Sequence, residues 1–135
     1  MRIVIISAAP GRKPPPDYAL SLAQGMKLMG HYVDVLDAWN GDGHRLPGYD
    51  YIVVVTRAVS SFSGKIPEAV AAILSAASSV AGKKGAAFVR KGGLFTARAL
   101  ANVMKAMEKE GMRVNWSDIL LNPPHAEAMG KLIGA

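Results

Sequence analysis

The chain has 135 residues, of which 50% are hydrophobic and 19% are charged, a balance typical of one globular domain rather than a disordered chain. It contains no cysteine, which excludes disulfides, thiol catalysis and cysteine-ligated metal or iron–sulfur centres. The histidines His31, His44 and His125 are isolated and show no metal-ligand spacing, so we expect no metal site. Sixteen Lys and Arg residues against ten Asp and Glu residues give a formal net charge of +6, which favours anionic partners.

The beginning of the chain carries too short an apolar run for a signal peptide, since only four apolar residues separate Arg2 from Ser7. No stretch of the sequence approaches the length of a membrane span. We therefore expect a cytoplasmic protein with no membrane segment.

Strand-like and helix-like segments alternate from the first residues onward. Arg2–Ser7 is a short β-branched run, of the kind found in strands covered on both faces. A helix is predicted from Asp17 to a stop at Gly30, followed by a second strand at Tyr32–Asp37. The apolar stripe of this helix comprises Ala19, Leu22, Ala23, Met26 and Met29.

The middle of the chain continues the alternation after one irregular segment. Ala38–Asp50 is polar and rich in glycine, so we expect a loop or a single helical turn there. Tyr51–Thr56 is a continuous apolar run, which predicts a third strand at a central position in the sheet. Pro67 and Glu68 mark the start of a second helix. Its apolar stripe comprises Val70, Ile73, Leu74 and Ala77.

The last third of the chain adds two strands and two helices. Gly85–Val89 and Met112–Leu120 are the fourth and fifth strands, and Pro123 opens a short terminal helix. A third helix lies between these strands and ends at Gly111. The stripes of the two helices comprise Leu100, Val103, Met104 and Met107, and then Ala126, Met129 and Leu132. The alternation predicts an α/β fold, a doubly wound five-stranded parallel sheet that forms a single domain over residues 1–135.

Ligands of such sheets bind at the carboxyl ends of the strands, where three loops of this chain meet. We name them loop one (Ala8–Pro16), loop three (Arg57–Ile66) and loop four (Arg90–Gly93). Basic residues in or beside these loops are Arg12, Lys13, Arg57, Lys65, Arg90 and Lys91. Two explanations remain open: charged residues are common in loops, or this edge binds a small molecule that bears phosphate. Long basic runs with interleaved aromatic residues are absent, which disfavours a nucleic-acid surface.

Two features of loops three and four each have a structural and a functional interpretation. Gly92 and Gly93 permit close backbone approach by a ligand, or simply form a turn that needs positive φ. Phe62 lies among serines, and we favour packing into the protein over stacking on a flat ligand ring. No nucleophile elbow and no carboxylate pair is evident, so no catalytic residue is identified and an enzyme would depend on a cofactor.

The loops resemble those of one known group of proteins. Phe62–Pro67, "FSGKIP", resembles the corresponding loop of NADPH-dependent FMN reductases, and Gly82–Leu100 resembles their fourth strand, Gly-Gly loop and helix. Leu22–Asp37 is similar to the helix-to-strand transition of flavodoxins. Together these segments resemble the flavodoxin-like superfamily over most of the chain, with a gap around Ala38–Leu46.

This resemblance implies the strand order 2-1-3-4-5, with FMN phosphate at loop one and the flavin ring between loops three and four. The cofactor-binding residues that it implies are Ser7, at the start of the phosphate loop, Phe62, Ser63 and Gly64 of loop three, and Arg90, Gly92 and Gly93 of loop four.

Loop one departs from the pattern of the superfamily, whose phosphate loops are rich in Ser, Thr, Gly and Asn. Pro14–Pro16 supply no N–H groups, and Asp17 as the helix N-cap would repel a phosphate. The donors that remain are Gly11, Arg12 and Lys13, together with the Ser7 hydroxyl. We therefore expect a clamp formed by the Arg12 guanidinium, together with the Lys13 ammonium, in place of an N–H cradle.

The leading hypothesis is an FMN protein that acts in electron transfer or in NAD(P)H-dependent reduction of a small acceptor. The alternatives are a non-enzymatic ligand-binding or interaction module that has lost FMN, and a site for another anion such as a nucleotide. The chain is basic, whereas flavodoxins that carry electrons are typically acidic. It is also shorter than typical reductases of this group, so a complete substrate pocket would require a homo-oligomer.

Overall fold

The computed structural model describes residues 1–10, 18–41, 43–60, 62–77 and 79–133. Five parallel strands form one sheet in the order β2-β1-β3-β4-β5, which confirms the predicted fold class and strand order. The strands are β1 (Arg2–Ala8), β2 (Tyr32–Asp37), β3 (Tyr51–Thr56), β4 (Lys84–Arg90) and β5 (Arg113–Leu120).

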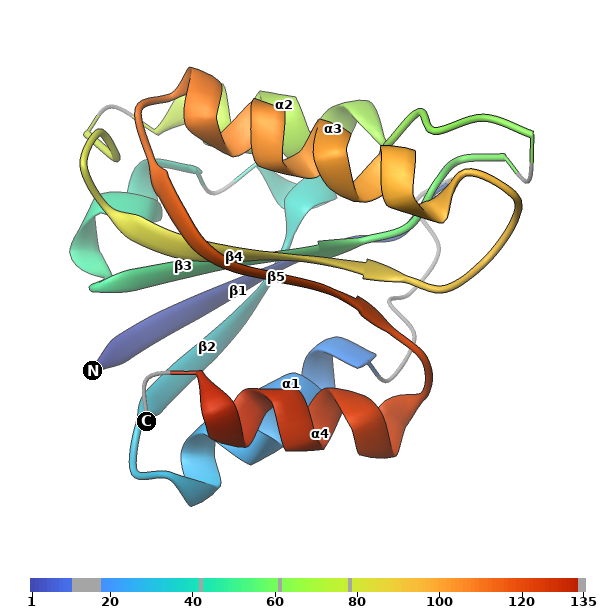
Figure 1. The fold of residues 1–135 in the computed structure, drawn as a ribbon. Helices are drawn as coiled ribbons and strands as arrows, with labels where there is room; N and C mark the ends of the chain where they lie inside the picture. Colours follow the sequence, from blue (N-terminus) through green and yellow to red (C-terminus); the bar gives the residue numbers. More distant parts are fainter. Residues whose placement is uncertain (11–17, 42, 61, 78, 134–135) are drawn as a thin grey trace.

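Helices cover both faces of this sheet (Figure 1). α2 and α3 lie on one face, and α1 and α4 lie side by side on the other. The helices are α1 (Tyr18–Leu28), α2 (Glu68–Ala76), α3 (Thr96–Lys109) and α4 (Pro123–Leu132). None of the helices in the described residues is long and apolar enough to cross a membrane.

The sheet buries apolar side chains on both faces. Successive side chains of a strand point to opposite faces, so Val4 and Ile6 join the core under α2 and α3, while Ile3 and Ile5 join the core under α1 and α4. All six residues of β3 are buried, which confirms its predicted central position. The carboxyl ends of these strands form the base from which the loops begin.

The structure corrects three details of the sequence interpretation. Ala38–Asp50 contains two short 3-10 helices, at Ala38–Asn40 and Gly43–Gly48, in place of a loop or one turn. Met29 and Leu132 were placed on buried stripes, but they are 47% and 53% exposed. Met29 follows the last residue of α1 and Leu132 is the last residue of α4, so neither side chain is covered by the sheet.

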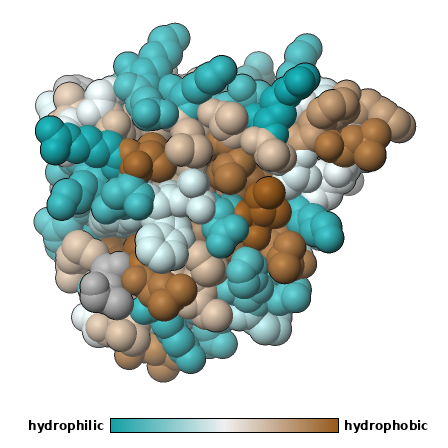
Figure 2. All heavy atoms as spheres, in the orientation of Figure 1, coloured by the Kyte–Doolittle hydropathy of each residue, from teal (hydrophilic) through white to brown (hydrophobic). Residues whose placement is uncertain are grey.

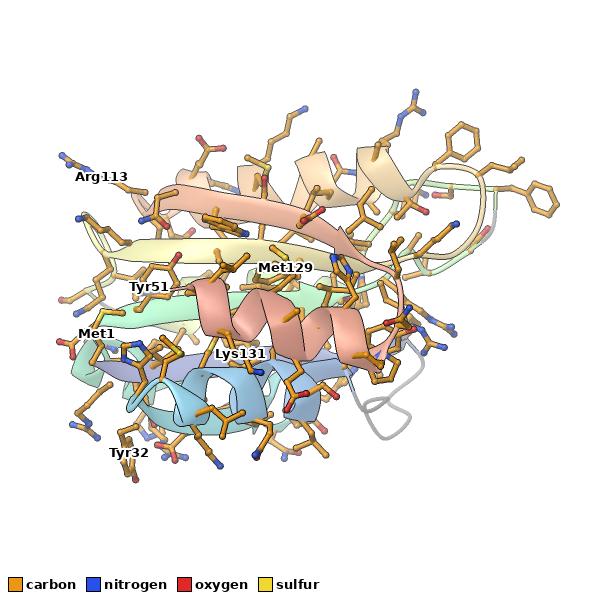
Figure 3. All side chains as sticks on the ribbon, turned by 60° about the horizontal axis from the view of Figure 1, so that its bottom comes forward. Met1, Tyr32, Tyr51, Arg113, Met129 and Lys131 are labelled. Carbon is orange, nitrogen blue, oxygen red and sulfur yellow. The ribbon has the colours of Figure 1, made fainter. Side chains whose placement is uncertain are left out.

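Burial of Tyr51 at the start of β3 makes stability sensitive to alkaline pH. Burial raises the pKa of Tyr51 from 10.0 to about 12, and its hydroxyl donates a hydrogen bond to Oδ1 of Asn115 at 2.5 Å. Figure 3 shows Tyr51 at the same end of the sheet as Met1 and Arg113. The folded protein favours the neutral phenol of Tyr51. The stability that this phenol contributes is fully present below about pH 10 and is lost as pH rises toward 12.

We therefore expect the free energy of unfolding to fall by about 2 kcal/mol over this range, measured by urea unfolding at a series of alkaline pH values. In Tyr51→Phe, we expect most of this decline in the free energy of unfolding to disappear. Burial also raises the pKa of Tyr49, so a small dependence should remain in the variant. An equally steep decline in Tyr51→Phe would show that other groups cause it.

Candidate binding site at the carboxyl edge of the sheet

The carboxyl ends of β1, β3 and β4 lie at one edge of the sheet, at the right of Figure 1, where loops three and four begin. This arrangement follows from the strand order, because β1 and β3 are neighbours and β3 and β4 are neighbours. Since the strands are parallel, all their carboxyl ends lie at this edge. The predicted site residues Gly11, Arg12 and Lys13 and the predicted N-cap Asp17 lie outside the described residues.

A first cavity of about 160 Å³ lies at the ends of β1 and β3, beside the first turn of α1. Ser7 and Thr56 line it and are only 4% and 5% exposed. The Thr56 hydroxyl donates a hydrogen bond to the Ala8 carbonyl oxygen at 2.6 Å, which ties the ends of β3 and β1 together. Arg57 and Arg90 also line the cavity, so two residues that carry hydroxyl groups and two basic residues border it.

Arg90 is positioned by an aromatic ring that sequence reasoning missed. Its guanidinium carbon lies 4.9 Å from the ring centroid of Tyr18, the first residue of α1. The Tyr18 hydroxyl in turn donates a hydrogen bond to the Leu121 carbonyl oxygen at 3.4 Å. Stacking of this kind orients a guanidinium while leaving N–H groups at its edge free to bind an anion. The sequence signal that could have indicated this ring was the position of Tyr18 in the helical turn that follows loop one.

A second cavity of about 190 Å³ adjoins the first, because Arg57 lines both. Gly92 and Gly93 of loop four form one wall. Gly93 has a φ of 75°, so the turn itself requires glycine there. A Cβ at Gly92 would meet nothing within 4 Å, so packing within the protein does not require glycine at this position.

The start of loop four is held by hydrogen bonds at both sides of the glycines. The Lys91 amide donates to the Leu120 carbonyl oxygen at 2.9 Å, which joins the loop to the end of β5. The Thr96 hydroxyl donates to the Gly92 carbonyl oxygen at 2.9 Å, which joins it to the start of α3. These contacts hold the glycine wall against the second cavity.

The prediction that Phe62 packs into the protein is wrong, since 80% of its surface is exposed. The Phe62 amide donates to the Ser60 hydroxyl and the Lys65 amide to the Ser63 hydroxyl, each at 3.0 Å. These local hydrogen bonds shape the tip of loop three so that the ring points outward. Phe62 is therefore free to contact a ligand or a partner.

Gly64 serves the structure of loop three. A Cβ there would come within 2.5 Å of the Arg98 side chain, and the Gly64 carbonyl oxygen accepts a hydrogen bond from Nδ2 of Asn102 at 2.7 Å. Gly64 is buried and Ser63 is half-buried, and neither lines the two cavities. Loop three is thus fastened to α3 through the glycine that the resemblance placed beside the flavin.

The surroundings of the two cavities are basic and partly apolar. Arg57, Lys65 and Lys91 are exposed, and loops three and four contain no Asp or Glu. Figure 2 shows hydrophobic atoms projecting over these loops, where Phe62 and Leu94 are 80% and 74% exposed. Within the described residues, no group of three His, Cys, Asp or Glu side chains could hold a metal ion. The edge is therefore basic and also carries exposed apolar side chains.

Comparison with known proteins identifies the fold. No protein-family model and no curated protein sequence matches this chain. Oxidised flavodoxin 1 of Bacillus cereus superposes with a TM-score of 0.70 at 16% identity, over 96% of this chain and 95% of that one. Two-electron reduced Megasphaera elsdenii flavodoxin gives a TM-score of 0.68 at 17% identity, over 95% of this chain and 96% of that one.

A short-chain flavodoxin associated with a non-canonical PDU bacterial microcompartment gives a TM-score of 0.71 at 13% identity, over 97% of this chain and 95% of that one. The chain therefore has the flavodoxin-like fold, as the sequence resemblance implied.

Proposed function

We propose that this protein binds FMN at the carboxyl edge of its sheet and acts in electron transfer or in NAD(P)H-dependent reduction of a small acceptor. The observation that carries the proposal is the pair of adjoining cavities at this edge. One presents guanidinium and hydroxyl groups, and the other presents glycine backbone. A ligand with a phosphate at one end and a flat ring at the other matches both.

The residues present fit the phosphate end of FMN. Ser7 supplies a buried hydroxyl, and Arg57 and Arg90 supply two cations in the first cavity. Guanidinium groups bind phosphate oxygens through paired, charge-assisted hydrogen bonds. Arg12 and Lys13 of loop one are proposed as further donors from the sequence alone. This arrangement replaces most of a backbone cradle with charged side chains.

The residues present also fit the ring end of FMN. Gly92 presents open backbone to the second cavity, which permits close approach of a flat ring. Phe62 lies exposed at the tip of the neighbouring loop and offers an aromatic face. When bound, FMN would supply the redox chemistry, while the chain binds it, orients it and limits the access of water.

The visible spectrum of the purified protein and a titration with FMN test the proposal. We expect a yellow protein, or a colourless one that quenches the fluorescence of added FMN at micromolar concentration. A colourless protein that quenches no flavin fluorescence would contradict FMN binding. It would instead favour a flavodoxin-like module for another ligand or for protein interaction. Binding of a nucleotide without FMN binding would favour the other anion site.

A further inference from the structure

We propose that loops three and four form a docking face for an acidic redox protein. The face comprises the exposed apolar side chains of Val59, Phe62 and Leu94 and the exposed cations Lys65, Lys91 and Arg98. The redox nature of the partner rests on the proposed FMN function, because the same edge would hold the flavin. The acidic nature of the partner rests on the charges of the face itself.

The charged side chains of this face are all basic, although the exposed Glu68 begins α2 three residues after Lys65. Lys65, Lys91 and Arg98 are exposed, and no Asp or Glu occurs in either loop. Along α3 the first acidic residue is Glu108, close to the end of the helix that lies far from the loops. Within the described residues no ion pair neutralises these three cations. Such a surface attracts a partner of negative potential and repels a positive one.

The face also carries exposed apolar side chains, and the core of a protein interface is usually apolar. Val59, Phe62 and Leu94 are 46%, 80% and 74% exposed, and Figure 2 shows hydrophobic atoms projecting in this region. Scattered single apolar residues on a surface need no explanation, but these three lie on adjoining loops. Exposed apolar side chains together with cations form a complementary surface for a partner that exposes apolar side chains together with carboxylates.

The face is held in shape before any partner arrives. The Val59 amide donates to the Lys65 carbonyl oxygen at 2.8 Å, which closes the base of loop three. The guanidinium carbon of Arg98 lies 5.2 Å from the ring centroid of Phe95, which orients that cation beside loop four. A fixed face lowers the conformational entropy that docking would cost.

A redox protein fits this face better than a lipid surface does. The proposed flavin lies at the same edge, so an occupant of the face must exchange electrons with it to serve the proposed function. Lipid headgroups carry the required negative charge but cannot do this. Anionic vesicles are therefore a competing probe in the test.

Isothermal titration calorimetry with an acidic plant-type [2Fe–2S] ferredoxin in its oxidised form tests the proposal on the full chain. We expect binding that weakens at least roughly tenfold when salt rises from about 20 mM to about 300 mM. Lys65→Glu/Lys91→Glu is expected to weaken binding at low salt by at least roughly tenfold. The basic protein cytochrome c is expected not to bind.

The matched control is Lys84→Glu/Arg113→Glu, which changes the net charge equally at the opposite end of the sheet, where Figure 3 shows Arg113. We expect this control to bind ferredoxin within about twofold of the unchanged chain. Equal losses in the two variants would overturn the proposal, because attraction would then depend on net charge alone. Absence of ferredoxin binding at low salt would also overturn it.

Binding to phosphatidylserine vesicles without binding to ferredoxin would overturn the protein partner in favour of a lipid surface. A separate FMN titration distinguishes these failures from a failure of the proposed function. Intact FMN binding without docking leaves the proposed function standing. Ferredoxin binding without FMN binding would contradict the proposed function but would still support the docking face.

Discussion

Arg57→Ala/Arg90→Ala is expected to weaken FMN binding by roughly 100-fold, because a charge-assisted hydrogen bond contributes about 1.5–3 kcal/mol and each tenfold change in affinity corresponds to about 1.4 kcal/mol. Both residues line the first cavity, where the phosphate is proposed to bind. Fluorescence titration of FMN against the variant measures the loss at low and at moderate salt.

Two controls separate loss of the site from loss of net charge or of structure. Lys84→Ala/Arg113→Ala removes the same charge at the opposite end of the sheet and is expected to leave FMN affinity within about twofold. The variant of the two arginines loses the stacking of Arg90 on Tyr18, about 0.5–1 kcal/mol, so it should remain folded on thermal unfolding.

A variant of the two cations in loop one tests which cations bind the phosphate. Arg12→Ala/Lys13→Ala is expected to weaken FMN binding by more than the value of an exposed ion pair, about 1 kcal/mol. Unchanged affinity in this variant would remove the clamp predicted from the sequence. Unchanged affinity in Arg57→Ala/Arg90→Ala would contradict the assignment of phosphate to the first cavity.

Gly25→Ala is expected to lower the free energy of unfolding by about 3 kcal/mol. A Cβ at Gly25 in α1 would overlap the backbone carbonyl oxygen of Glu127 in α4. At the same crossing, a Cβ at Gly130 would overlap the backbone carbonyl oxygen of Leu22. Neither overlap can be relieved by a side-chain rotation, so the two helices would have to move apart. Urea unfolding followed by circular dichroism measures the loss.

Gly48→Ala is the matched control, because a Cβ there meets nothing within 4 Å and its backbone is not left-handed. We expect its free energy of unfolding to stay within about 0.5 kcal/mol of the unchanged chain. Equal stability of Gly25→Ala and Gly48→Ala would show that the packing of α1 on α4 adjusts freely.

The positions of the strands and helices could be predicted because local sequence patterns indicate them. Tyr51–Thr56 is apolar without interruption, and a strand buried on both faces is the structure that such a run favours. Gly30 and Gly111 were predicted to end helices, and both have positive φ, at 90° and 84°. The prediction of buried stripes was wrong at Met29 and Leu132, where the helices end and periodicity no longer describes the surroundings.

The short 3-10 helix Ala38–Asn40 has one local contact, at its N-cap, and one contact that no local pattern contains. The Asp37 carboxylate accepts a hydrogen bond from the Trp39 amide at 3.0 Å, and the Trp39 ring N–H donates to the Ala9 carbonyl oxygen at 2.7 Å. The second contact joins the segment to the end of β1, far away along the chain. Sequence periodicity therefore predicted only a loop or a turn there.

For the site, the sequence by itself determined the edge, because alternating strands and helices place Ser7, Arg90 and the two glycines of loop four at the carboxyl ends of parallel strands. Only the tertiary structure decided which side chains meet there. The stacking of Arg90 on Tyr18 and the outward direction of Phe62 arise from contacts between separate elements and from the shape of a loop. Residue spacing predicts which faces of most strands and helices are buried, but it carries no information about contacts between side chains of separate elements.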